Sequence, residues 1–315
     1  MNKAQKAAQV VVGSCLNIQS DETVLIVTTE DLTELARLVY EASLRRSKQT
    51  LMMEISKTTV TSVPLPLAEF MKTVDVIIAL TSPSFSHTDA RRNACRAGAR
   101  IASLPNITHA AFSRLADADF KQIARRSRKL ADILSIGKNV RVWAPNGTDL
   151  RLSIDRRRGY ADTGLIHQKG AFSNLPAGEA SVAPLEGRCE GILIADSLLG
   201  TAAGDGEKTK VIIKNGRAVR VSGGPEAKRL SRMLTEAGPA SRVIAEFGIG
   251  TNEAAVLSGC TLEDEKVLGS VHIGLGNNLS FGGNNTCRLH IDLIVANAGV
   301  EIDGKIILEN ASLYI

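Results

Sequence analysis

Aromatic side chains are scarce in this chain, making up 3% of its 315 residues, with a single tryptophan. That scarcity disfavours the stacking platforms with which many proteins bind single-stranded nucleic acid. Long apolar runs are also missing: no stretch reaches the roughly eighteen residues that a membrane-spanning helix needs. The N-terminal segment is amphipathic, and its apolar stretch is too short and interrupted for a signal peptide. We therefore expect no membrane association.

Cysteine is sparse as well, with five residues that are scattered along the chain and form no C-x-x-C pair. An odd, scattered set disfavours a disulfide framework or a zinc knuckle, so we expect a reduced, cytoplasmic protein. Several motifs are absent too. Without H-E-x-x-H, G-x-S-x-G or a phosphate-binding glycine loop, the sequence gives no support to a standard zincin, a serine hydrolase or a nucleotide-binding protein.

The overall composition is that of a folded protein, with 44% hydrophobic and 23% charged residues. The net charge of +5 arises from 38 basic against 33 acidic residues. Much of the basic excess is local, in the runs 91–100, 121–129 and 155–159. Such runs are usually solvated faces, and no nucleic-acid-binding motif accompanies them. We expect no nucleic-acid partner, whereas an anionic small substrate is compatible with these arginines.

The first part of the chain alternates strand-like and helix-like segments. Strand patterns occur at 22–29, 50–56, 74–81 and 101–105, and helical patterns at 32–46, 86–99 and 117–135. Alternation of this kind indicates a parallel sheet covered by helices. We therefore predict an α/β domain over residues 1–136.

Beyond residue 136 the pattern changes to hairpins. Strand pairs with turn residues between them occur at 139–154, 210–224 and 299–310, and one helix is expected at 226–238. We predict a second domain over 137–315, of α+β class and mainly antiparallel. Its boundary with the first domain is expected between Ser135 and Asn139.

Two of the five histidines, His272 and His290, lie in strand-like runs of the C-terminal segment. Strand side chains alternate between faces, so His290 and Asp292 point to the same side. If the two strands are neighbours, His272 joins them on one surface. Two imidazoles and a carboxylate on a rigid sheet make a site for a divalent metal.

Two glutamates are further candidates. Glu179 lies in a loop punctuated by proline and glycine, and Glu246 ends an apolar run at 242–252. A carboxylate at the end of a buried strand costs free energy unless it is paired, protonated or metal-bound. A salt bridge to one of the many arginines is the alternative for Glu246. We expect the acidic cluster 263–266 to be a solvated turn.

Substrate-binding candidates are fewer and rest on their surroundings. Asn277 lies in a loop rich in glycine and asparagine between the two histidine strands, where backbone and amide groups can approach a ligand. Arg158 and Tyr160 precede His167 in a loop suited to a carboxylate or a polar ring, and His87 follows a strand end. For His87 and His167 the alternative is a structural role, and the sequence favours that role over substrate binding.

The segments LPAGE, EFGIGTN, EDEKVLGSVHIGLG and HID together resemble the thermophilic metallo-aminopeptidase family, of aminopeptidase T and S type. This resemblance runs from about residue 20 to the end. It implies an enzyme that self-associates into a homo-oligomer. It also implies a two-metal centre whose ligands are Glu179, Glu246, His272, His290 and Asp292.

The chain departs from that family at Leu279, where the peptidases have a tyrosine ligand. It is also similar to the 2,5-dihydroxypyridine dioxygenases, a branch of the same superfamily that holds one ferrous iron by two histidines and a carboxylate. This second resemblance implies that His272, His290 and Asp292 hold the iron. The two glutamates then serve as acid/base or supporting groups.

Three hypotheses follow. The first is a metal-dependent, aminopeptidase-like hydrolase with zinc, cobalt or manganese, in which Glu179 or Glu246 takes a proton from a metal-bound water that attacks a short peptide or amide. The alternative is a mononuclear non-haem iron(II) dioxygenase that cleaves a hydroxylated pyridine or another aromatic ring. The third is a non-enzymatic protein that retains the fold and holds no metal. We place the hydrolase first because both glutamates and both histidines are present.

Overall fold

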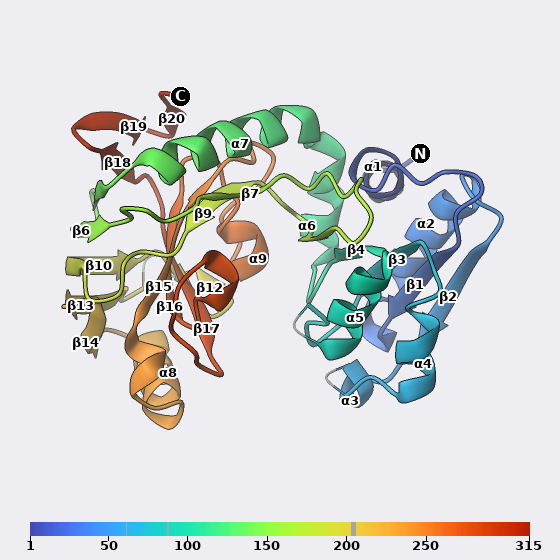
Figure 1. The fold of residues 1–315 in the computed structure, drawn as a ribbon, viewed down its shortest axis with the longest axis horizontal. Helices are drawn as coiled ribbons and strands as arrows, with labels where there is room; N and C mark the ends of the chain where they lie inside the picture. The colour runs from blue at the N-terminus through green and yellow to red at the C-terminus, as the bar shows by residue number, and fades with distance from the viewer. Residues whose placement is uncertain (61, 87, 203–205) are drawn as a thin grey trace. The chain divides into compact units, whose positions relative to one another are not determined.

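The computed structural model describes residues 1–315 apart from 61, 87 and 203–205. The chain divides into two compact units (Figure 1). Unit 1 comprises residues 1–121 and 163–177, and unit 2 comprises residues 122–162 and 178–315. This division differs from the boundary expected near residue 136, because unit 2 takes most of the preceding helix and unit 1 regains a later segment.

Unit 1 contains a five-stranded parallel sheet in the order β2-β1-β3-β4-β8. Its strands are β1 (Val24–Thr28), β2 (Thr50–Glu54), β3 (Val76–Leu80), β4 (Arg100–Ser103) and β8 (Phe172–Asn174). The apolar, β-branched runs of β1 and β3 are buried along their whole length, as expected for central strands with both faces covered. The predicted α/β class is confirmed. The fifth strand, β8, comes from a segment that the sequence analysis assigned to the second domain.

The helices of unit 1 follow its strands, apart from the first helix, which precedes β1. They are α1 (Lys3–Val10), α2 (Thr33–Leu44), α3 (Lys57–Val60), α4 (Leu65–Phe70), α5 (Asp89–Ala97) and α6 (His109–Arg114). Helix α7 (Phe120–Ile136) continues into unit 2, which also contains α8 (Pro225–Glu236) and α9 (Thr261–Asp264). None of the described helices is both long and apolar enough to cross a membrane.

Unit 2 contains two antiparallel sheets, and α7 and α8 lie at opposite ends of them (Figure 1). The eight-stranded sheet has the order β14-β13-β10-β6-β5-β18-β19-β20. Its strands are β5 (Asn139–Trp143), β6 (Asp149–Ser153), β10 (Cys189–Ala195), β13 (Thr209–Lys214), β14 (Arg217–Ser222), β18 (Gly299–Ile302), β19 (Lys305–Glu309) and β20 (Ser312–Leu313). The three predicted hairpins are confirmed as β5–β6, β13–β14 and β18–β19.

The seven-stranded sheet has the order β12-β11-β17-β16-β15-β9-β7. Its strands are β7 (Tyr160–Asp162), β9 (Glu179–Val182), β11 (Ser197–Leu198), β12 (Thr201–Ala202), β15 (Ile244–Gly250), β16 (Val271–Gly276) and β17 (His290–Val295). Phe247, Ile273 and Leu293 of the three central strands join one apolar core with residues of the other sheet. Because side chains alternate along a strand, the residues between them point to the opposite face. That face carries the candidate site.

Candidate metal centre

The predicted histidine strands are neighbours, since β16 pairs with β17 on one side and with β15 on the other. In this register His272 lies opposite Gly248, and Gly274 lies between Glu246 and Asp292. The strand period therefore brings the imidazoles and carboxylates of three strands to one face. The carboxylate of Glu179 reaches the same group from β9.

Glu246 lies between the two imidazoles. One of its oxygens, Oε1, is 3.6 Å from His272 Nε2, and the other, Oε2, is 3.0 Å from His290 Nε2. The five donors form two overlapping groups whose ligand atoms lie within 4.8 Å of one another: Glu179, Glu246 and His272 in one, and Glu246, His290 and Asp292 in the other. The structure therefore brings together all five predicted metal ligands.

The donor atoms at the two ends of this group are buried and lack hydrogen bonds. Glu179 Oε2 lies 3.4 Å from His272 Nε2, and Asp292 Oδ1 lies 3.2 Å from His290 Nε2, yet neither oxygen has a hydrogen-bond partner. Buried carboxylate oxygens are costly unless they are paired or bound to a metal. Imidazole nitrogens with carboxylate oxygens suit zinc, manganese and ferrous iron. The residues present therefore fit a divalent metal.

Two glycines make room for these rings. A Cβ on Gly248 would overlap the imidazole of His272 across the strand pair. A Cβ on Gly274 would lie 2.8 Å from the Cβ of Glu246 and 2.9 Å from Cε1 of His290. Both glycines are thus required by close approach, and the sequence analysis did not single them out for this role.

The pKa values of the group reflect its charge pairing. Burial would raise the pKa of Glu246, but hydrogen bonds and charges from His272 and His290 outweigh it and hold that pKa well below its ordinary value. Burial would lower the pKa of His272, yet Glu179 and Glu246 raise it to about 9. The pKa of His290 also lies well above its ordinary value, because Asp292 and Glu246 outweigh burial. A metal must therefore displace protons from both rings.

His290 is fixed in the tautomer that suits a metal. Its Nδ1 donates a hydrogen bond of 2.8 Å to the backbone carbonyl of Asn277, which leaves Nε2 turned toward Glu246 and Asp292. Such an outer hydrogen bond orients a metal-binding imidazole and raises its basicity. Asn277, predicted as a substrate-binding residue, thus contributes its carbonyl here. Its side-chain amide donates within the loop, to the carbonyl of Cys287.

Lys266 is the main residue that the sequence analysis missed. Its ammonium group is buried and lies 2.7 Å from Glu179 Oε1, 2.9 Å from Glu265 and 3.7 Å from Asp162. These carboxylates raise the pKa of Lys266 well above its ordinary value although burial opposes the shift, and burial raises the pKa of Glu265 to about 8. The prediction that residues 263–266 form a solvated turn is wrong, because Glu263, Asp264 and Lys266 are at most 3% exposed.

The remaining predicted substrate residues are more dispersed. In unit 2 the guanidinium of Arg158 lies 5.6 Å from the ring of Tyr160, and both side chains are exposed. In unit 1 the Nε2 of His167 donates a hydrogen bond of 2.9 Å to the backbone carbonyl of Ser14. The predicted role of His87 lies outside the described residues.

The five donor side chains, here called the metal group, differ in their exposure to solvent: Glu179, Glu246, His272, His290 and Asp292. The His272 side chain is 1% exposed and Glu246 is 4% exposed, Glu179 and Asp292 are 12% and 14% exposed, and His290 is 24% exposed. His290 is therefore the member of the group that is most open to solvent.

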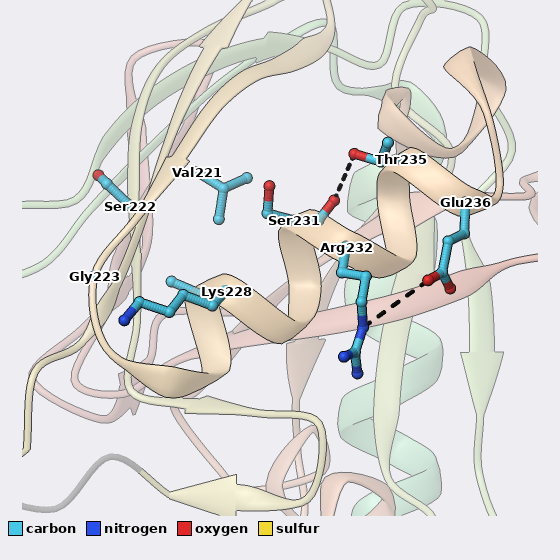
Figure 2. Close-up of a pocket in the computed structure, with 9 residues that line it drawn as sticks. Val221, Ser222, Gly223, Lys228, Ser231, Arg232, Thr235 and Glu236 are labelled. Carbon is cyan, nitrogen blue, oxygen red and sulfur yellow. Dashed lines mark hydrogen bonds and ion pairs between the residues drawn. The ribbon is translucent and has the colours of Figure 1, made fainter.

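A cavity of about 560 Å³ lies elsewhere in unit 2, between the end of β14 and helix α8 (Figure 2). Its lining includes the exposed side chains of Lys228, Arg232 and Glu236, and Arg232 lies 3.9 Å from Glu236. None of its lining residues belongs to the metal group, so we assign the chemistry to the metal group and not to this cavity.

Comparison with known proteins decides the family. Residues 2–315 match the sequence model of the NicX family, described as 2,5-dihydroxypyridine 5,6-dioxygenase. The chain belongs to this family. No protein of curated function matches the sequence in a direct comparison. The family match favours the dioxygenase hypothesis over the aminopeptidase-like hydrolase that the sequence analysis placed first.

Solved structures show the same fold. A 2,5-dihydroxypyridine dioxygenase from Pseudomonas putida KT2440 is similar to this chain with a TM-score of 0.81 and 16% identity, over 99% of this chain and 98% of that one. Wild-type AmpT from Thermus thermophilus is similar with a TM-score of 0.72 and 17% identity, over 99% of both chains. Both resemblances stated from the sequence therefore correspond to proteins of this fold.

Proposed function

We propose that this protein is a mononuclear iron(II) dioxygenase that opens a hydroxylated pyridine or a related hydroxylated aromatic ring. The observation that carries the proposal is the cluster of two imidazoles and three carboxylates, in which Glu246 links the His272 group to the His290 and Asp292 group, in a chain of the NicX family. The reaction named for the family adds both atoms of O₂ and breaks the bond between ring carbons 5 and 6. The ring itself supplies the electrons that reduce the oxygen, so no other reductant is needed.

His272, His290 and Asp292 would hold the metal. Two histidines and one carboxylate leave positions for substrate and oxygen, and when bound the iron would supply the redox chemistry that joins them. Glu246 would lie beside the metal and balance its charge, because its two oxygens face the Nε2 atoms of the two imidazoles. The carbonyl of Asn277 would fix the tautomer of His290.

Glu179 is suited to hold a proton. Lys266 occupies its Oε1, whereas its Oε2 is buried without a hydrogen bond, and burial raises its pKa despite the nearby lysine. A carboxylate with a raised pKa is a better proton acceptor near neutral pH. Glu179 Oε2 would therefore take the proton that a ring hydroxyl loses on binding. Arg158, which is exposed, would help to attract an anionic substrate.

The proposal is tested with protein purified without oxygen and loaded with ferrous iron. We expect one iron per chain and oxygen uptake with 2,5-dihydroxypyridine. His272→Ala should lose the iron, whereas Glu179→Gln should keep it and turn over more slowly, by roughly 10²-fold or more. Two zinc, cobalt or manganese ions per chain, with release of amino acids from short peptides and no oxygen uptake, would refute the proposal in favour of the hydrolase.

A further inference from the structure

We propose that Phe281 is a specificity-determining residue that forms the wall against which the aromatic ring of the substrate packs. This inference rests on the proposed function. Phe281 is half-buried and lies in the loop between β16 and β17. Its ring is stacked on the imidazole of His290, with centroids 5.2 Å apart and planes at 28°. An aromatic side chain in this position borders the metal group directly.

The position of Phe281 coincides with His290, the most exposed side chain of the metal group. Exposure rises from 1% at His272 to 24% at His290, the residue on which Phe281 stacks. A ring that binds through its hydroxyl oxygens beside His290 and Asp292 therefore meets the edge or the face of Phe281. Aromatic pairs favour such offset or edge contacts, with centroids roughly 4.5–7 Å apart.

The loop that carries Phe281 is fixed by polar contacts outside the metal group. Glu186 Oε1 accepts hydrogen bonds of 2.8 Å from the side chain of Asn278 and from the backbone N–H of Asn284. Arg157 pairs with Glu186 and also donates to the carbonyl of Gly282. Since Glu186 and Arg157 hold the loop on both sides of Phe281, the wall is preformed and a ligand need not order it.

A further contact ties the aromatic residue itself to the sheet. The backbone carbonyl of Phe281 accepts a hydrogen bond of 3.3 Å from the N–H of Ala183, which follows β9. In contrast, the side chain of Leu279, two residues earlier in the same loop, is 53% exposed. The loop thus turns Phe281 toward the metal group and Leu279 toward solvent. This difference makes Leu279 a matched control.

The experiment measures the Kd for 2,5-dihydroxypyridine of iron-loaded protein without oxygen, and then KM, kcat and iron content. Phe281→Leu keeps an apolar side chain but removes the aromatic face, so Kd and KM should rise roughly tenfold, with kcat and iron content close to wild type. Phe281→Tyr keeps the aromatic face, so its Kd should lie within about twofold of the wild-type Kd. Leu279→Ala should bind as the wild type does.

Unchanged Kd and KM in Phe281→Leu, beside a wild-type enzyme that opens the ring, would overturn this inference alone. So would loss of iron in Phe281→Leu without weaker substrate binding, because Phe281 would then act only by supporting His290. If the wild-type protein neither binds 2,5-dihydroxypyridine nor consumes oxygen with it, the proposed function fails, and this inference fails with it.

Discussion

Glu246 offers one carboxylate oxygen to each imidazole of the metal centre, at 3.6 Å from His272 and 3.0 Å from His290. Two features of the sequence make this possible. The strand period turns all three side chains away from the apolar core, and glycines opposite His272 and beside Glu246 leave space for the rings. At the scale of single residues the centre therefore depends on the absence of side chains as much as on the ligands.

The substitution Gly248→Ala tests whether metal binding needs the space that Gly248 leaves for the His272 ring. The added methyl group would overlap the His272 ring, so the imidazole must leave its position and metal affinity should fall roughly 10–100-fold, as when an orienting residue is lost. The measurement is iron content after dialysis against a weak chelator. Gly13→Ala is the control, because its Cβ would meet only the flexible end of Arg46. Equal iron retention in the two variants would contradict this account.

At the scale of elements, the strands and hairpins could be predicted because their signals are local. Apolar runs, period-two alternation and turn residues such as Asn215-Gly216 specify β1, β3 and the hairpin β13–β14 without reference to the rest of the chain. The alternation also placed His290 and Asp292 on one face. Whether β16 and β17 are neighbours depends on long-range pairing, which was assumed from the sequence and is confirmed by the structure.

The segment 263–266 shows where local patterns fail. Three acids and a lysine in a row are typical of a solvated turn, yet this one is buried. The charge of Lys266 is paired with the carboxylates of Glu179 and Asp162. These residues lie about 90 and 100 positions earlier in the sequence, in strands β9 and β7. No local pattern reveals such partners. For the same reason the return of residues 163–177 to unit 1 could not be predicted.

Lys266→Met tests the energetic weight of that buried charge. The substitution keeps the length of the side chain but leaves Glu179 and Glu265 without their cation, so the free energy of unfolding should fall by about 3–5 kcal/mol. Urea denaturation measures the change. Lys208→Met is the matched control: its partner is Asp196 and its side chain is 38% exposed, so its loss should cost about 1 kcal/mol or less. Similar losses in both variants would contradict the buried role of Lys266.

At the scale of the whole molecule, the paired charges make stability depend on pH. The pKa of His272 is about 9 in the folded protein against 6.5 for the free side chain, and that of Glu265 is about 8 against 4.5. A raised folded-state pKa adds stability below the unfolded pKa, and this stability is lost as the pH rises through the folded value. Both groups therefore destabilise the metal-free protein as the pH rises.

For protein stripped of metal by a chelator, the free energy of unfolding should fall by a few kcal/mol between pH 6.5 and pH 9. Denaturation in urea at several pH values measures it. With iron bound the imidazoles are neutral, so their share of this decline should disappear, the total decline should become smaller, and the metal should instead be lost at acid pH. A metal-free protein that becomes more stable over the same interval would show that the imidazoles are not held in the protonated form by their carboxylates.

We propose that the metal group inserts oxygen into a ring and does not activate water. Ring opening under ¹⁸O₂, followed by mass spectrometry of the product, tests it most directly. We predict that iron-loaded protein converts 2,5-dihydroxypyridine to an opened product with two ¹⁸O atoms, and that His290→Ala makes none. A product whose new oxygen comes only from water, or hydrolysis of a peptide in place of ring opening, would contradict the claim.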